Sequence, residues 1–582
     1  MDSKLAADGN IVEGLRSAGF EGGGLLALAL APGVGLAMAM SNGWSTSTSN
    51  IDPAETVRAV EEAFRPRWVL WGSEAEELVR AGVRVAKCWN VAAVHRLLVG
   101  GWRADPARVW AELQGLESDA LPALATVDLF TDLLETGPPD EPVRGDGHLR
   151  PEWLVAGFDW TTQRLIRWAQ LAAEAAVRQE ARLVSLEDRP RARSTARSES
   201  AAELLCAELS TDGLPMDRQV AEDTIASFVG PRPRNEVEAS EQRRARDSEV
   251  LRHSPNAGYD LRNPAQVKSM LRGIGVELPD TRAWRLEAIQ GTHPLIDALL
   301  EWRKAERIAT TFGYGWLDEH LGADGRLRGA WSGSDGAAGR MTASAGLHNM
   351  PANLRSAIVA EAGHVFVRAD LGQIEPRILA AVSGDASLAK ATADDDLYLP
   401  VATQLGVDRA TAKVAVLGAM YGQTTGHGAV ALRGLESAYP VAMRYLKEAD
   451  LAGQVGRSVR TFGGRLIRTA SARIGEPGER DSRSRAAGQG RYARNAMVQG
   501  AAAEFFKVWA ANVRLRSAVF GARIVLCLHD ELLVHAPAQH SDAVAALLSQ
   551  CLVDSARQWA PDDSVRFVAD VSVIRRWSDA KP

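Results

Sequence analysis

The fold is decided by the stretch HVFVRADLGQIEPR, residues 364–377, in which an apolar run ends on the acid Asp370. This pattern predicts a buried strand that carries a carboxylate at its end. A similar stretch, RIVLCLHDELLVHA at 523–536, predicts a hairpin with Asp530 and Glu531 at its turn. Half-buried carboxylates are costly unless they are paired, protonated or bound to metal. Either acid alone could simply end a strand and face water, so the surrounding sequence has to decide.

Three segments around these acids resemble motifs of the family A DNA polymerases, and they occur in the family's order. They are DLGQIEPR (370–377), similar to motif A, RATAKVAVLGAMYG (409–422), similar to motif B, and HDE (529–531), similar to motif C. The flanking segments GRMTASAGLHNMP (339–351), SGD (383–385), TFGGR (461–465) and RNAMVQGAAAE (494–504) are also similar to family segments. An ordered match of this many motifs does not arise by chance. The resemblance covers the chain from about residue 203 to its C-terminus.

This resemblance implies a fold class for the C-terminal part. Residues 203–582 are expected to form an α+β right-hand polymerase. Its thumb is expected at about 203–330, its palm at about 331–384 and 451–582, and its fingers at about 385–450.

The N-terminal part has a different pattern. Residues 1–185 begin with short apolar strands and continue into helical sequence, which predicts a small α/β domain. By resemblance this domain is exonuclease-like (RNase H-like). Residues 186–202 are rich in Arg and Ser and predict a linker or an exposed loop.

The resemblance also assigns chemistry to the acids. Asp370 and Asp530 are expected to ligate two Mg²⁺ ions, for which Mn²⁺ can substitute. The backbone carbonyl of Leu371 would complete one shell, and Glu531 would be auxiliary. Two metals ~3.5–4 Å apart clamp the attacking and leaving oxygens of an in-line phosphoryl displacement. The implied activity is templated addition of dNTPs to a primer 3′-hydroxyl, with primer-template DNA and dNTPs as partners.

Residues 409–421 would gather several side chains on one face if they form an α-helix, because Arg409, Lys413, Leu417 and Tyr421 follow one another at i+4. The alternative is a solvated amphipathic face. However, only 9 of the 67 basic residues are lysines, so a lysine at the motif position is informative. By resemblance this face binds the dNTP, the two cations contact its triphosphate, and Lys413 protonates the leaving pyrophosphate.

Further positions have roles through the resemblance. Glu375 matches the steric gate that excludes a ribose 2′-hydroxyl, Gln373 lies in the same motif, and His529 is expected beside the dNTP. Donors expected to contact the DNA near the primer terminus are Arg340, Arg491, Asn495 and Gln499. Ten arginines against three acids between Arg457 and Arg494 predict phosphate contacts, or alternatively an exposed solubilising loop.

The sequence departs from the family beside the expected nucleotide site. Leu417 replaces an aromatic residue and Val416 replaces Asn, while Leu371, Gly372 and Pro376 replace Tyr, Ser and Leu of motif A. Loss of a stacking ring worth ~1–3 kcal/mol predicts an active but atypical polymerase.

The N-terminal part lacks the carboxylates that 3′-to-5′ exonuclease chemistry needs. No Asp-x-Glu occurs in residues 1–180, Asn90 stands where a second acid is expected, and Asp159 is a solitary candidate. We therefore expect a structural relic without proofreading. We also expect no separate 5′-nuclease domain.

Composition narrows the remaining possibilities. The 582 residues are 46% hydrophobic and carry a formal charge of −6, which excludes a disordered chain and confines nucleic-acid contacts to local patches. The uncharged segment 22–40 contains a central Pro-Gly, which predicts two buried strands and no membrane span. The 4 cysteines form no C-x-x-C pair, as suits a reducing cytoplasm. We expect a cytoplasmic, nucleoid-associated protein that acts as a monomer.

Two other functions remain open beside a DNA polymerase of repair or gap filling. A catalytically weak DNA-binding protein that retains the polymerase fold would account for Leu417 and Val416, although Asp370 and Asp530 argue against it. A single-subunit RNA polymerase is opposed by Glu375.

Overall fold

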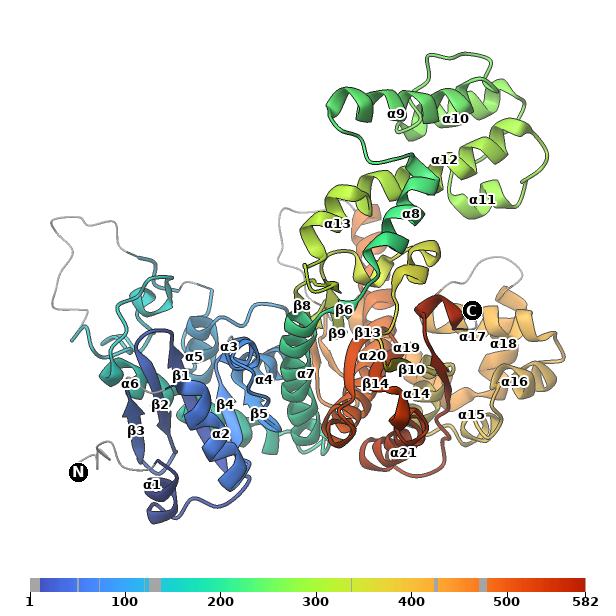
Figure 1. Ribbon diagram of the computed structural model, residues 1–582. Helices are drawn as coiled ribbons and strands as arrows, with labels where there is room; N and C mark the ends of the chain where they lie inside the picture. The colour runs from blue at the N-terminus through green and yellow to red at the C-terminus, as the bar shows by residue number, and fades with distance from the viewer. Residues whose placement is uncertain are drawn as a thin grey trace. The chain divides into compact units, whose positions relative to one another are not determined.

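The computed structural model describes residues 11–49, 52–72, 74–119, 121–124, 138–336, 338–422, 428–469 and 479–580 (Figure 1). The chain divides into two compact units. The first comprises the residues up to Thr211, Trp331–Thr342 and Val367–Val573, and the second comprises Asp212–Ala330, Ala343–Phe366 and the residues from Ile574 onward. None of the described helices is long and apolar enough to cross a membrane.

A five-stranded sheet of order β3-β2-β1-β4-β5 forms the N-terminal part of the first unit. The segment 22–40 supplies the antiparallel pair β1 and β2, in which Ala31 lies opposite Gly35, so the predicted strand pair is confirmed. Only glycine fits at position 35, because a Cβ there would lie 2.0 Å from the Thr48 carbonyl oxygen. Strand β4 pairs in parallel with both β1 and β5. The strands are β1 Leu25–Ala31, β2 Gly35–Ala39, β3 Ser45–Thr48, β4 Arg67–Leu70 and β5 Lys87–Asn90.

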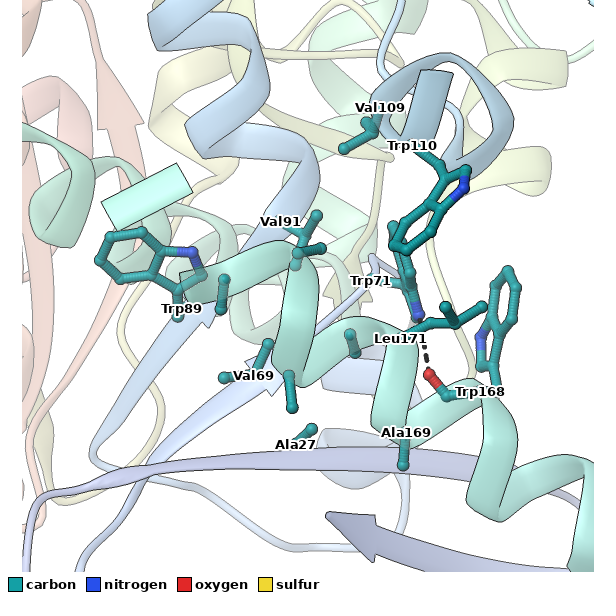
Figure 2. Close-up of a cluster of buried hydrophobic side chains, with 14 of the residues drawn as sticks. Ala27, Val69, Trp71, Trp89, Val91, Val109, Trp110, Trp168, Ala169 and Leu171 are labelled. Atoms are coloured by element: carbon teal, nitrogen blue, oxygen red, sulfur yellow. Dashed lines mark hydrogen bonds between the residues drawn. The ribbon is translucent and has the colours of Figure 1, made fainter. Parts of the chain in front are cut away.

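Alternation along β1 gives this sheet two different buried faces. Leu26 and Leu28 join a cluster with helix α2, whereas Ala27 and Ala29 join a second cluster with the long helix α6. Figure 2 shows that the second cluster packs small side chains against large indoles, those of Trp71, Trp89, Trp110 and Trp168. The helices are α1 Ile11–Ser17, α2 Pro53–Phe64, α3 Glu74–Arg80, α4 Val91–Val99, α5 Pro106–Gln114 and α6 Thr162–Val184.

The prediction of a linker at 186–202 is wrong. Helix α7 spans Ala192–Asp212 and buries Ala196 and Glu199. The Glu199 carboxylate pairs with Arg465 (2.5 Å) and Lys507 (2.7 Å), which lie in distant parts of the sequence. The polar residues of 186–202 suggested solvent exposure, because local composition does not reveal the distant partners that satisfy a buried charge.

The second sheet of the first unit has the order β13-β14-β10-β15 and carries both predicted acids. Strands β13 and β14 form the predicted hairpin, with Leu528 opposite Glu531. The central position of β10 brings the strand of Asp370 beside this hairpin. The elements of this region are β10 His364–Leu371, α14 Ile374–Ser383, α20 Glu479–Ser517, β13 Arg523–Leu528, β14 Glu531–Pro537, α21 Ser541–Trp559 and β15 Ala569–Ile574.

A group of helices follows α14. Helix α17 has the predicted bounds, because the Asp408 side chain accepts a hydrogen bond from the Thr411 N–H at its start and Gly422 (φ 68°) ends it. The elements are α15 Ala386–Ala391, α16 Tyr398–Leu405, α17 Arg409–Tyr421, α18 Gly428–Ala438, α19 Pro440–Gln454, β11 Val459–Arg460 and β12 Leu466–Ile467.

The second unit is mainly helical, as predicted for 203–330, but it begins at Asp212 because α7 belongs to the first unit. Its core contains Leu271, Leu299 and Trp302. Its helices are α8 Arg218–Val229, α9 Glu236–Leu251, α10 Pro264–Gly273, α11 Ala283–Glu287, α12 Pro294–Thr311 and α13 Tyr314–His320. Its short strands are β6 Leu214–Pro215 and β7 Arg326–Leu327, whereas β8 Trp331–Asp335 and most of β9 Arg340–Ala343 belong to the first unit.

Candidate active site

The two predicted acids meet where β10 ends beside the β13–β14 hairpin. Asp370 is the penultimate residue of β10, and Asp530 lies in the two-residue link between β13 and β14. The Leu371 N–H donates a hydrogen bond to the Asp530 carbonyl oxygen (3.0 Å), which fastens the end of one strand to the turn of the other. The two acids, 160 positions apart in sequence, are therefore neighbours in space.

The backbone on both sides of this junction is strained. Gln373 (φ 51°) and His529 (φ 54°) adopt the left-handed conformation, which residues other than glycine rarely occupy. Such strain persists where the surrounding structure fixes it, and it is concentrated at functional sites.

The electrostatics of the pair favour a bound cation. Burial raises the pKa of Asp530 to about 6, and the neighbouring Asp370 carboxylate contributes to the rise. Burial also raises the pKa of Asp370, although the Arg368 guanidinium acts in the opposite direction. Carboxylates whose pKa is raised by burial and by neighbouring acids become easier to ionise when a divalent cation lies beside them.

Arg368 is a site residue that the sequence did not single out. It lies two positions before Asp370 on β10, so both side chains point to the same face of the strand. Its guanidinium contacts Asp370 (2.5 Å), Glu531 (3.1 Å) and Asp570 (3.7 Å). The available signal was an arginine inside an otherwise apolar strand.

A cavity of about 250 Å³ opens beside the acids. Residues of the three motif-like segments and of β9 line it together: Arg340, Leu371, Gln373, Glu375, Leu417, Tyr421, His529 and Asp530. Tyr398 and Phe506 also line it, and the sequence did not suggest either ring. The cavity therefore has aromatic walls although Leu417 carries no ring.

Glu375 is held by two neighbours inside this cavity. Arg340 Nη2 donates to its carboxylate (2.8 Å), and so does the Tyr421 hydroxyl (2.5 Å). Burial, together with this contact, raises the pKa of Tyr421 to about 12, so the hydroxyl stays protonated and donates. Glu375 is fixed in one orientation against the cavity wall.

The i+4 face of α17 exists as predicted. Leu417 and Tyr421 contact the cavity, Lys413 is exposed, and Arg409 pairs with Asp396. Asp396 also accepts a hydrogen bond from Gln373 Nε2 (3.2 Å), so it connects the helix to the residues that follow β10.

The remaining predicted donors lie on α20 at i+4 spacing. Arg491 is exposed and Gln499 hydrogen-bonds with the Tyr421 hydroxyl. The Asn495 amide, oriented to suit its neighbours, donates to the Met420 carbonyl (2.7 Å). Asn495 and Gln499 connect α20 to the C-terminal end of α17.

Part of the predicted phosphate-binding patch has a different role. Arg460 donates to the Leu98 carbonyl (3.0 Å), Arg468 donates to the Val99 carbonyl (2.7 Å), and Arg465 is buried with Glu199. Arg460 and Arg468 bind helix α4 and Arg465 binds helix α7, so the prediction is wrong for these three. Arg473 and the side chain of Arg480 lie outside the described residues.

The N-terminal sheet has no comparable group of acids. Asn90 is buried and caps α4 by accepting from the Ala93 N–H (2.8 Å), while the Asp159 side chain is 91% exposed. Among the described residues up to 185, no three His, Cys, Asp or Glu side chains lie close enough together to hold a metal ion.

Comparisons with known proteins show which sequences and which solved structure the chain is similar to. The sequence profile of DNA polymerase family A matches residues 259–579. The chain is 26% identical to DNA polymerase I of Deinococcus radiodurans over 56% of its own length and 37% of the relative's. It is 28% identical to the thermostable DNA polymerase I of Thermus thermophilus over 55% of its own length and 40% of the relative's. The matched regions therefore cover about two-fifths of these relatives.

A solved structure has a similar fold. The polymerase domain of Pol1 from M. smegmatis, in complex with DNA primer-template and dNTP, superposes with a TM-score of 0.68 and 20% identity, over 99% of each chain.

Proposed function

The chain belongs to the family A DNA polymerases, and from this premise we propose that it adds dNTPs to a primer 3′-hydroxyl under the direction of a DNA template. The observation that supports the proposal most strongly is the junction of Asp370 and Asp530 at the edge of a cavity lined by residues of all three motif-like segments. Phosphoryl transfer depends mainly on positioning and charge stabilisation, and this junction supplies groups for both.

The donor set fits Mg²⁺, with Mn²⁺ as a substitute. Carboxylate and carbonyl oxygens are the ligands that these hard cations prefer, and Asp370, Asp530 and the Leu371 carbonyl would supply them. Two such ions would lower the pKa of the attacking hydroxyl and stabilise the charge that develops on the triphosphate.

Residues of α17 would act on the other side of the reacting phosphate. Lys413 is exposed and can reach a triphosphate as a proton donor to the leaving pyrophosphate. Arg409 would exchange its Asp396 partner for the triphosphate, because both partners are anionic oxygens.

Glu375 would select the sugar. Its carboxylate is held by Arg340 and Tyr421, so it cannot swing away from a ribose 2′-hydroxyl without losing both hydrogen bonds. This restraint favours dNTPs over NTPs and supports DNA synthesis over RNA synthesis.

The domain roles follow the same proposal. The helices α8–α13 of the second unit would serve as the thumb, the second sheet as part of the palm, and the helices α15–α19 as the fingers of a right hand. The N-terminal α/β part would be an exonuclease-like (RNase H-like) domain without proofreading, since the face of its sheet that contacts α6 is packed with indoles and alanines.

The proposal includes a cellular setting. A DNA polymerase that acts as a monomer in repair or gap filling, in the cytoplasm at the nucleoid, agrees with the absence of a membrane-spanning helix among the described residues.

Primer extension by the full chain tests the proposal. We expect Mg²⁺-dependent, templated extension with dNTPs, much weaker extension with NTPs, and none with Asp530→Ala. A catalytically weak DNA-binding protein would instead bind the primer-template without extending it.

The same substrate tests the N-terminal part. With dNTPs withheld, a mismatched primer should stay intact. Degradation that Asp159→Ala abolishes would overturn the proposed lack of proofreading.

A further inference from the structure

The Arg368 guanidinium is a fixed cation among carboxylates, and it has no assigned role in the proposed reaction. Its side chain is 8% exposed. Nη2 lies 2.5 Å from Asp370 Oδ2 and 3.4 Å from Glu531 Oε2, while Nε lies 3.1 Å from Glu531 Oε1. Nη1 lies 3.7 Å from Asp570 Oδ2. These partners come from β10, β14 and β15, which are neighbours in the sheet, so one guanidinium connects three strands.

In this arrangement Glu531 and Asp370 have different roles. Both Glu531 oxygens face Arg368, so Glu531 anchors the guanidinium. Asp370 offers Oδ2 to Arg368, which leaves Oδ1 as the oxygen for another ligand. Since arginine does not deprotonate in proteins, its charge remains when a metal ion approaches.

A charge at this distance affects metal binding directly. A positive charge within 4 Å of a carboxylate repels any further cation that the same carboxylate attracts. The repulsion is little screened because Arg368 is buried. The guanidinium thus holds the carboxylates in place and also competes with metal for them.

We propose that Arg368 is a positioning residue that fixes Asp370 and Glu531 before metal binds and weakens the affinity of the site for divalent cations. The inference rests on the proposed function, because it requires Asp370 to be a metal ligand. Its consequence is that metal binds weakly to the protein alone and enters mainly with a dNTP, whose negative charges offset the guanidinium.

Titration of the full chain with Mn²⁺, followed by electron paramagnetic resonance without DNA or nucleotide, tests this. Arg368→Gln should bind Mn²⁺ about 10-fold more tightly than the parent, since one nearby positive charge is gone. Arg368→Lys keeps the charge and should stay within about 3-fold of the parent. A merely structural role would instead lower or preserve the affinity of Arg368→Gln, and either result overturns the inference.

A second variant covers a failure of Arg368→Gln to fold. Arg368→Met removes the charge and keeps a flexible, unbranched side chain at this position. This variant should also bind Mn²⁺ more tightly than the parent, and parental affinity would overturn the inference.

One control distinguishes a failure of the inference about Arg368 from a failure of the proposed function. Asp370→Asn should abolish Mn²⁺ binding by Arg368→Gln. If Asp370→Asn does so while Arg368→Gln is no tighter than the parent, the inference about Arg368 fails and the proposed function stands. If Asp370→Asn changes nothing, the metal is held elsewhere and both fail.

Discussion

The two larger sheets of the first unit are built from similar apolar strands but differ in what their side chains contact. On β1, Ala27 and Ala29 belong to a buried cluster that also contains several indoles, and that face becomes a core (Figure 2). On β10 the corresponding alternation delivers Arg368 and Asp370 to a junction beside an open cavity. The alternation of apolar residues therefore determines which face of a strand is buried. A few charged residues near the end of the strand determine whether that face packs as a hydrophobic core or forms a candidate active site.

The largest effect on the rate of nucleotide addition should follow a change in the candidate active site. Lys413→Ala should lower the rate of nucleotide addition by ~10²–10⁴-fold, the usual contribution of a positioned proton donor. Quench-flow single-turnover kinetics measure it. Lys390→Ala, at another exposed lysine on α15, is the matched control and should leave the rate unchanged. Equal rates for both variants would remove Lys413 from the chemistry.

A change on the core side should affect stability and leave chemistry intact. Trp89 is 1% exposed and donates through Nε1 to Gln179 (2.9 Å). Trp89→Ala should lower the free energy of unfolding by ~3–5 kcal/mol. Urea denaturation followed by circular dichroism measures this loss.

Two measurements complete that test. Trp102, which is 70% exposed, supplies the control, and Trp102→Ala should change stability by less than ~0.5 kcal/mol. A fall in the rate of nucleotide addition by folded Trp89→Ala would show that the two regions are not separable.

The surroundings of Glu504 on α20 should make the stability sensitive to pH. Burial raises the pKa of Glu504 from 4.5 to about 7, and its carboxylate accepts from the Gly463 N–H (2.9 Å). A raised pKa in the folded state adds stability below pH 4.5 that is lost as the pH rises through about 7. Glu504→Gln should therefore show a shallower decline in the free energy of unfolding across this window. Glu448→Gln, at an exposed carboxylate on α19, should retain the parental slope.

The smallest effect is expected from a change at Leu417, the cavity position at which an aromatic ring was expected. Leu417→Tyr should tighten dNTP binding by about 10-fold, within the ~1–3 kcal/mol that stacking contributes. Leu417→Met, which keeps the volume without a ring, should bind dNTPs as the parent does. Stopped-flow titration gives both affinities, and equal affinities for the Tyr and Met variants would show that position 417 only packs.

Much of the fold could be predicted because it depends on local periodicity. The strand ending at Asp370, the hairpin around Asp530 and the helix 409–421 all follow from the spacing of apolar residues. Helix α7 could not be predicted in the same way, since its buried Glu199 is satisfied by Arg465 and Lys507 far along the chain.

The same limit applies to the site. Residues inside motif-like segments were found, whereas Arg368, Tyr398 and Phe506 were missed because their roles arise from three-dimensional contacts. The patch arginines Arg460 and Arg468 were misjudged for the same reason, since their carbonyl partners at Leu98 and Val99 are remote in sequence.

The most direct test compares one acid from each region during a single nucleotide addition to a primer-template with Mg²⁺. The parent and Asp159→Asn should add the complementary dNTP at the same rate. Asp370→Asn should be slower by ~10³-fold or more, the scale on which charged groups act in phosphoryl transfer. Parental speed in Asp370→Asn, or addition that ignores the template base, would contradict the assignment of catalysis to the acids of the second sheet.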